Sequence, residues 1–174
     1  NGGMIRADGG QVLLTTQAAG SLLANVVNNT GVIQAQTLVT GENGTIRLLG
    51  GTQSGTLNVA GTLDASAPTG GNGGAIETSA ARVNIASGVI LTTAAPSGTT
   101  GTWLISPQDF TVGSLSTDNI SGPTLSAQLV TNSVTISTAA AGGGDIHVNN
   151  AIAWTASSTP TTLSLLADGN VNIN

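Results

Sequence analysis

The chain has 174 residues, of which 6% are charged and 2% aromatic, and its three arginines and eight carboxylates give a net charge of −5 without any lysine. Few cations argue against a nucleic-acid partner, and no apolar run of about 18 residues predicts a membrane-spanning helix, so we expect no membrane insertion. The hydrophobic fraction of 39% is rich in β-branched residues and favours an all-β fold over disorder.

Residues 1–112 contain four repeats, whose first strands follow glycines near positions 3, 31, 61 and 88 in GMIRA, GVIQA, GTLDAS and GVILTT. A second glycine-led strand follows in each repeat, in GQVLL, GTIRLL, GAIET and GTWLI, and a third short strand closes the unit, as in Val83–Ala86 and Phe110–Val112. Strands this short must pair with their equivalents in the neighbouring repeats. We therefore predict an all-β parallel β-helix (β-solenoid) of about six coils, with three short strands per coil.

The repeats also predict local details. The segments 67–70 (APTG) and 95–98 (APSG) align and predict equivalent corners, because proline fits a corner better than a ladder interior. In Val83-Asn84-Ile85 the alternation turns the apolar side chains inward and Asn84 outward. Residues 17–29 fit either a brief helix or a protruding loop.

The pattern breaks at 113–131, which we interpret as an irregular insertion with about one helical turn near 124–129. Strands resume in 132–174, where VTI at 134–136 matches LSL at 163–165 at a spacing of 29, and IHV at 146–148 matches VNI at 171–173 at a spacing of 25. This region is predicted to continue the β-helix. The pattern is cut at both ends, so we expect a longer parent chain and any targeting signal outside this sequence.

Candidate catalytic groups are few. Asp145 and His147 lie on one face of a strand by alternation, which indicates a solvated histidine, with a functional pair as the alternative. The carboxylates Asp64, Glu77, Asp109 and Asp168 are expected on different coils, so we do not expect them to form an acid–base pair. The glycine runs at 70–74 and 142–144 lack the lysine of a phosphate loop, and no Cys/His cluster is present for zinc. We predict no catalytic residue, no cofactor and no metal site.

The asparagines and tryptophans have structural explanations. Stacked amides can bond along the axis as ladders. Trp103 and Trp154 are predicted to fill the core or a corner, with carbohydrate stacking as the alternative. The asparagines that fall on outward faces or at strand ends are Asn28, Asn29, Asn58, Asn84, Asn149, Asn150, Asn170 and Asn172.

Long strings of the sequence resemble the filamentous haemagglutinin-type exoproteins of Gram-negative bacteria, among them GGMIRADGGQVLLTTQAAG, GTLDASAPTGGNGGAIETSAARVNI and GDIHVNNAIAWTA. The chain has WLISP, with Ser106, where such proteins usually read WLIDP. The resemblance implies a right-handed β-helix exported by two-partner secretion through an outer-membrane transporter. It also implies an adhesin, or a stalk that carries a contact-dependent toxin. The Asn-Pro-Asn motif of the family's secretion domain is absent, which places this segment in the rod.

These observations predict a non-enzymatic rod segment of a secreted bacterial surface adhesin. Its expected partners are the outer-membrane transporter during export and a host or bacterial cell-surface receptor or glycan, with end-to-end self-association also open. Two other functions remain as alternatives. One is a subunit of a self-assembling extracellular matrix filament. The other is a polysaccharide-cleaving β-helix enzyme, which would require Asp145 or His147.

Overall fold

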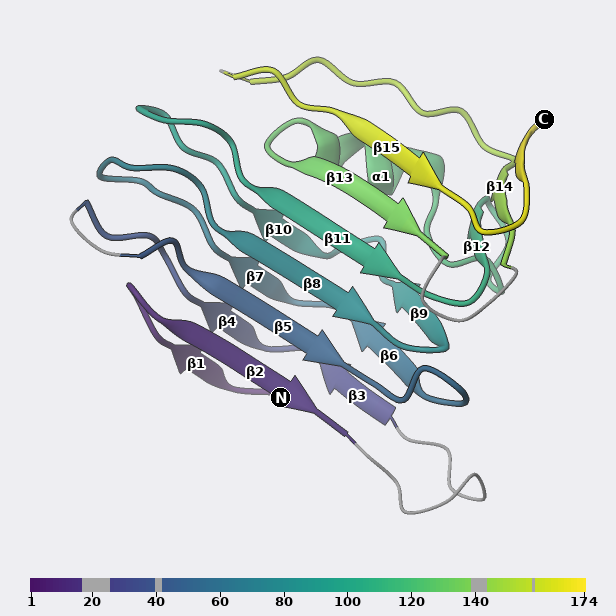
Figure 1. Cartoon of the computed structure of the whole chain (residues 1–174), viewed down its shortest axis with the longest axis horizontal. Coiled ribbons are helices and arrows are strands. Elements are labelled where there is room, and N and C mark those ends of the chain that lie inside the picture. The colour runs from purple at the N-terminus through teal and green to yellow at the C-terminus, as the bar shows by residue number, and fades with distance from the viewer. Residues whose placement is uncertain (17–25, 40–41, 139–143, 158) are drawn as a thin grey trace.

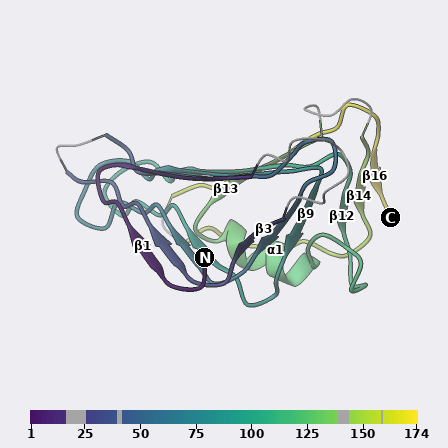
Figure 2. The same ribbon diagram turned by 90° about the horizontal axis from the view of Figure 1, so that it is seen from below.

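The computed structural model of the chain is a β-solenoid in which strands from successive turns lie side by side and pair in parallel (Figure 1). It describes residues 1–16, 26–39, 42–138, 144–157 and 159–174. Seen from below the stack, flat walls of strands enclose a slim interior (Figure 2). The predicted parallel all-β architecture is confirmed, and the described residues contain one helix.

One sheet runs the full length of the stack in the order β15-β13-β11-β8-β5-β2. Positions 12, 46, 76, 103, 134 and 163 are in register along it, so the turns contain 34, 30, 27, 31 and 29 residues. The spacings of the glycine-led strands and of the 134 and 163 segments are thereby confirmed. The prediction of about six coils is corrected to about five turns, because most turns are longer than the sequence repeats indicated. The strands of this sheet are β2 (Gln11–Thr15), β5 (Thr45–Leu49), β8 (Ala75–Ser79), β11 (Thr102–Ser106), β13 (Ser133–Ser137) and β15 (Leu163–Leu166).

Two further walls accompany this sheet only through the first part of the stack. Their strand orders are β1-β4-β7-β10 and β3-β6-β9, and each contains one strand of every early turn. Residues 26–29 of the ambiguous segment 17–29 form β3, whereas 17–25 lie outside the described residues. The strands of these walls are β1 (Met4–Arg6), β4 (Val32–Gln34), β7 (Thr62–Asp64), β10 (Ile90–Thr92), β3 (Val26–Asn29), β6 (Thr56–Val59) and β9 (Arg82–Ile85).

A fourth sheet begins where the wall β3-β6-β9 ends. The strand β12 (Phe110–Val112), expected to continue that wall, instead pairs with β14 (Ile146–Val148), which pairs with β16 (Val171–Ile173). The pairing of β14 with β16 confirms the predicted spacing of 25 residues. The reason for the change of wall is that Asn119 lies between β9 and β12. Its backbone carbonyl accepts from the N–H of Ile85 at 2.8 Å, and its side-chain oxygen accepts from the N–H of Thr111 at 2.8 Å.

The irregular segment 113–131 contains the helix α1 (Gly122–Leu129), which is longer than the single turn expected from the sequence. Ser121 caps its first turn by accepting from the N–H of Thr124 at 3.2 Å, and a proline stands in that turn. The buried side chains of Leu125 and Leu129 join the core beside β10. The helix therefore stands where the next strand after β10 would lie.

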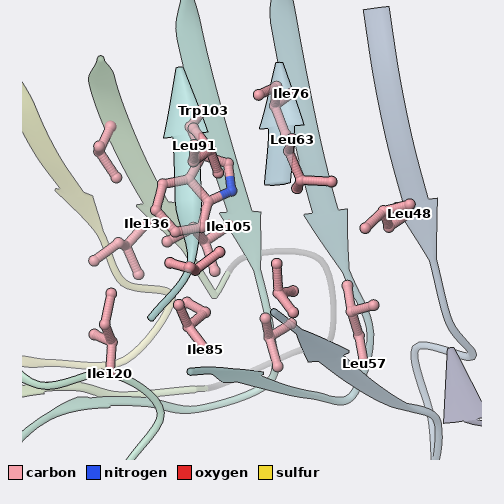
Figure 3. Packing of buried hydrophobic residues seen from close by; sticks show 14 of the residues in the cluster. Leu48, Leu57, Leu63, Ile76, Ile85, Leu91, Trp103, Ile105, Ile120 and Ile136 are labelled. Atoms are coloured by element: carbon pink, nitrogen blue, oxygen red, sulfur yellow. The ribbon is translucent and has the colours of Figure 1, made fainter. Parts of the chain in front are cut away.

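The interior is filled almost entirely by aliphatic side chains from the facing walls (Figure 3). In this core the fourth repeat is displaced by one residue from the glycine alignment, because Leu91 and not Ile90 pairs with Leu63. A shift of one residue exchanges the two faces of a strand. Leu91 is accordingly 3% exposed and Ile90 61%. The glycine alignment was wrong here because a side chain at Gly88 would meet no atom within 4 Å, so packing does not hold that position in register.

Candidate functional site

A ladder of asparagine amides runs along the outer face of the wall β3-β6-β9. Asn28, Asn58 and Asn84 are in register, and alternation along each short strand turns all three side chains outward. The amide nitrogen of Asn58 donates to Asn28 Oδ1 at 2.6 Å, and that of Asn84 donates to Asn58 Oδ1 at 2.8 Å. The predicted ladder is confirmed for these three residues.

The ladder leaves part of each amide available to a ligand. An asparagine side chain has two N–H donors and an oxygen with two lone pairs. At Asn58 the ladder engages one donor and one lone pair. The remaining donor and lone pair of this half-buried side chain form no hydrogen bond with the described residues, so this face of the wall is polar.

Arg82 lies at the upper end of the ladder, and its guanidinium is held by neutral oxygens. Its Nε donates to Asn84 Oδ1 at 3.0 Å and its Nη2 to the carbonyl of Thr117 at 2.6 Å. The other two arginines form ion pairs, Arg6 with Asp8 and Arg47 with Glu77, each at 2.6 Å. Within the described part of the chain, Arg82 thus differs from the other two arginines in forming no ion pair with a carboxylate.

The loop before α1 forms a wall beside this ladder. Asp118 shapes the loop by accepting from the N–H of Leu115 at 2.8 Å. Together the ladder and the loop enclose a hollow of about 400 Å³, within the size range of ligand pockets. We call it the ladder groove, and it is lined by Asn29, Thr30, Asn58, Val59, Ala60, Arg82, Asn84, Ile85, Ala86, Ser116, Thr117 and Asp118.

The sequence candidates for acid–base chemistry have other contacts. Asp145 and His147 do share the outward face of one segment, as predicted. The carboxylate of Asp145 accepts from the N–H of Asn170 at 2.7 Å, and His147 Nδ1 lies 3.4 Å from the amide nitrogen of Asn172. Both contacts connect one turn to the next, and neither joins the two residues to each other.

The remaining carboxylates are dispersed over the walls. Asp64 accepts from the Gln36 amide at 2.7 Å on one wall, whereas Glu77 pairs with Arg47 on another. Asp109 accepts from the N–H of Asp145 at 3.0 Å, and Asp168 follows β15 in the last turn. Among the residues that the structure describes, no three His, Cys, Asp or Glu side chains are grouped so that they could hold a metal ion.

The two tryptophans differ in environment. Trp103 is fully buried, and its indole nitrogen donates to Thr78 Oγ1 at 3.0 Å, so its predicted place in the core is confirmed. Trp154 is 37% exposed, and its indole nitrogen donates to Thr161 Oγ1 at 2.9 Å. It borders a shallow hollow beside α1.

Sequence reasoning found the ladder but not the groove. In the sequence, Arg82 is one of three arginines, and residues 113–118 belong to the expected irregular insertion. The signal for Arg82 was its position two residues before Asn84 in the same strand, which puts both side chains on one face. Nothing in the sequence shows that the loop folds back over that face.

Comparison with known proteins identifies no relative: no family model matches the chain, and neither a curated protein nor a solved structure shows significant similarity. In the described part of the chain, no helix combines the length and apolar character needed to span a membrane.

Proposed function

We propose that this chain is a non-enzymatic rod segment of a secreted bacterial surface adhesin, and that it holds a binding face in an extended position. The resemblance of its sequence to filamentous haemagglutinin-type exoproteins supports this proposal, as does the β-solenoid. Its partners are then an outer-membrane transporter during export and a receptor or glycan on a host or bacterial cell.

The observation that carries the proposal is that polar side chains connect successive turns. Asp8 accepts from the amide of Gln34 at 2.9 Å, and Arg47 donates to Glu77 at 2.6 Å, each across one turn. With the asparagine ladder, these contacts hold the turns in register on the outside, while the aliphatic core does so inside. These two carboxylates therefore contribute to holding the turns together.

The composition agrees with export as an unfolded chain. The chain contains no cysteine, so no disulfide obstructs threading through a pore. A solenoid gains its stability from contacts between neighbouring repeats, so folding can proceed turn by turn as the chain emerges.

The test combines microscopy with a binding assay. Electron microscopy of the purified protein should show single rods, and the labelled protein should bind intact cells saturably, whereas heat-unfolded protein should not. Regular fibres would favour the matrix-filament alternative. Release of reducing or unsaturated sugars from a polysaccharide, lost on replacing Asp145 or His147, would favour the enzyme. Absence of binding to every cell type tested would contradict the proposal.

A further inference from the structure

We propose that the ladder groove binds a glycan with an isolated carboxylate, such that Arg82 holds the carboxylate and the asparagine amides hold hydroxyls of the adjoining sugars. This inference rests on the proposed function and specifies where on the rod the binding face lies and what it recognises.

Arg82 has hydrogen-bond donors left for a ligand. A guanidinium has five N–H donors, and contacts with Asn84 and Thr117 engage two of them. These contacts fix its orientation before any ligand arrives, which lowers the entropic cost of binding. This fixed cation, which forms no ion pair with the described residues, suits a carboxylate, which accepts charge-assisted hydrogen bonds from arginine in a fork geometry.

Beside Arg82, the amides of Asn58 and Asn84 line the groove. A sugar hydroxyl both donates and accepts, and the outward part of the Asn58 amide offers one donor and one lone pair. The turns repeat every 4.7–4.9 Å or so, the spacing of paired strands, so amides recur along the groove at a regular interval. An extended chain of hydroxyl-bearing rings fits such a periodic surface.

The larger apolar side chains along the described floor of the groove are buried. Its larger apolar residues, Val59 and Ile85, are only 1% and 8% exposed because they face the core. A lipid chain or an apolar peptide therefore finds no large exposed apolar side chain to pack against there. The occupant is polar.

The charge pattern restricts the glycan further. The groove contains one cation, Arg82, and one carboxylate, Asp118, in the opposing loop. A ligand with carboxylates on consecutive sugars would bring one of them toward Asp118, and like charges repel. The groove therefore favours an acidic sugar that alternates with neutral sugars.

The experiment is a calorimetric titration of the full chain with a hexasaccharide of alternating glucuronic acid and N-acetylglucosamine, and with the same hexasaccharide after reduction of its carboxylates to alcohols. We expect the reduced form to bind about tenfold more weakly or worse, as expected for loss of a charge-assisted hydrogen bond. Arg82→Gln should weaken binding of the acidic form similarly. Arg47→Gln, which removes an exposed arginine from a different wall, is the matched control and should leave the affinity unchanged.

Salt dependence of wild-type binding is a second measurement that needs no variant, and affinity for the acidic form should fall as ionic strength rises. Equal affinity for the two hexasaccharides, equal effects of the two arginine variants, or no binding of the acidic form would overturn the inference. If Arg82→Gln still binds cells like the wild type, the inference fails while the proposed function stands. If the wild type binds no cells, the proposed function fails.

Discussion

The side-chain amide of Asn132 takes the place of a strand beside Thr93. Its Oδ1 accepts from the Thr93 N–H at 2.7 Å, and its Nδ2 donates to the carbonyl of Leu91 at 3.0 Å. The side-chain amide of Gln128 bonds to the backbone two residues earlier along β10 in the same way. It accepts from the N–H of Leu91 at 3.2 Å and donates to the carbonyl of Val89 at 3.3 Å. Two side-chain amides thus satisfy the edge of β10, where unpaired backbone groups would otherwise be buried.

Asn132→Asp should lower the free energy of unfolding by about 3 kcal/mol or more, because a carboxylate at this buried site would face the carbonyls of Leu91 and Gln128 without a proton to donate. Urea denaturation measures the change. Asn43→Asp adds the same charge at an exposed position and should stay within about 0.5 kcal/mol of the wild type. Equal effects of the two substitutions would contradict the capping role of Asn132.

Leu91→Ala should cost about 2–5 kcal/mol, since it removes a buried side chain from the core. Ile90→Ala removes a side chain that is 61% exposed and should cost about 0.5 kcal/mol. The two variants differ by one position, so comparison of their denaturation midpoints tests the register of β10 directly. A larger loss of stability for Ile90→Ala than for Leu91→Ala would contradict this register and support the alignment on Gly88.

Gly101→Ala should destabilise the protein by more than about 4 kcal/mol or prevent folding, because the added Cβ would lie 2.0 Å from the carbonyl oxygen of Gly74 in the turn below. Gly88→Ala is the matched control, since a Cβ there meets nothing within 4 Å. We expect the control to be neutral or to stabilise by up to about 1 kcal/mol by restricting the unfolded chain. Similar melting temperatures for the two variants would show that the turns are less closely spaced at Gly101 than the structure has them.

Asp8 should make the free energy of unfolding depend on pH. Burial alone would raise the pKa of this carboxyl, but hydrogen bonds from the side chains of Gln34 and Arg6 outweigh it. With a further bond from the backbone of Gln36, they hold the pKa of Asp8 below its ordinary value of 3.8. A lowered folded-state pKa contributes stability that is present above the unfolded pKa and is lost as pH falls through the folded one.

Asp8→Asn should therefore lower the melting temperature at pH 7, and the difference from the wild type should shrink as the pH is lowered below about 4. Thermal scans from neutral to strongly acidic buffer measure it. Glu42→Gln, which removes one exposed carboxylate elsewhere, controls for net charge. A melting-temperature difference between Asp8→Asn and the wild type that stays constant across this pH range would exclude Asp8 as the source of the pH dependence.

The repeats were predictable where glycines of successive turns make the same close backbone contact. Gly31 and Gly61 lie against the backbone of the turn below, so they mark the register correctly. Gly88 has no such contact, and there the alignment failed. The roles of Gln128 and Asn132 were not predictable, because each amide bonds to a strand about 40 residues away. The ladder groove depends likewise on a loop that returns over β9.

Asn119 and α1 cover the last strands of two walls, β9 and β10, where the cross-section of the solenoid changes. The edges of these strands are therefore not open to pairing with another chain at that junction. Among the described strands, only the sheet from β2 to β15 is common to both portions. This continuous sheet joins two portions of the solenoid that differ in cross-section. A solenoid with one such continuous sheet can combine turns of different cross-section in a single uninterrupted structure.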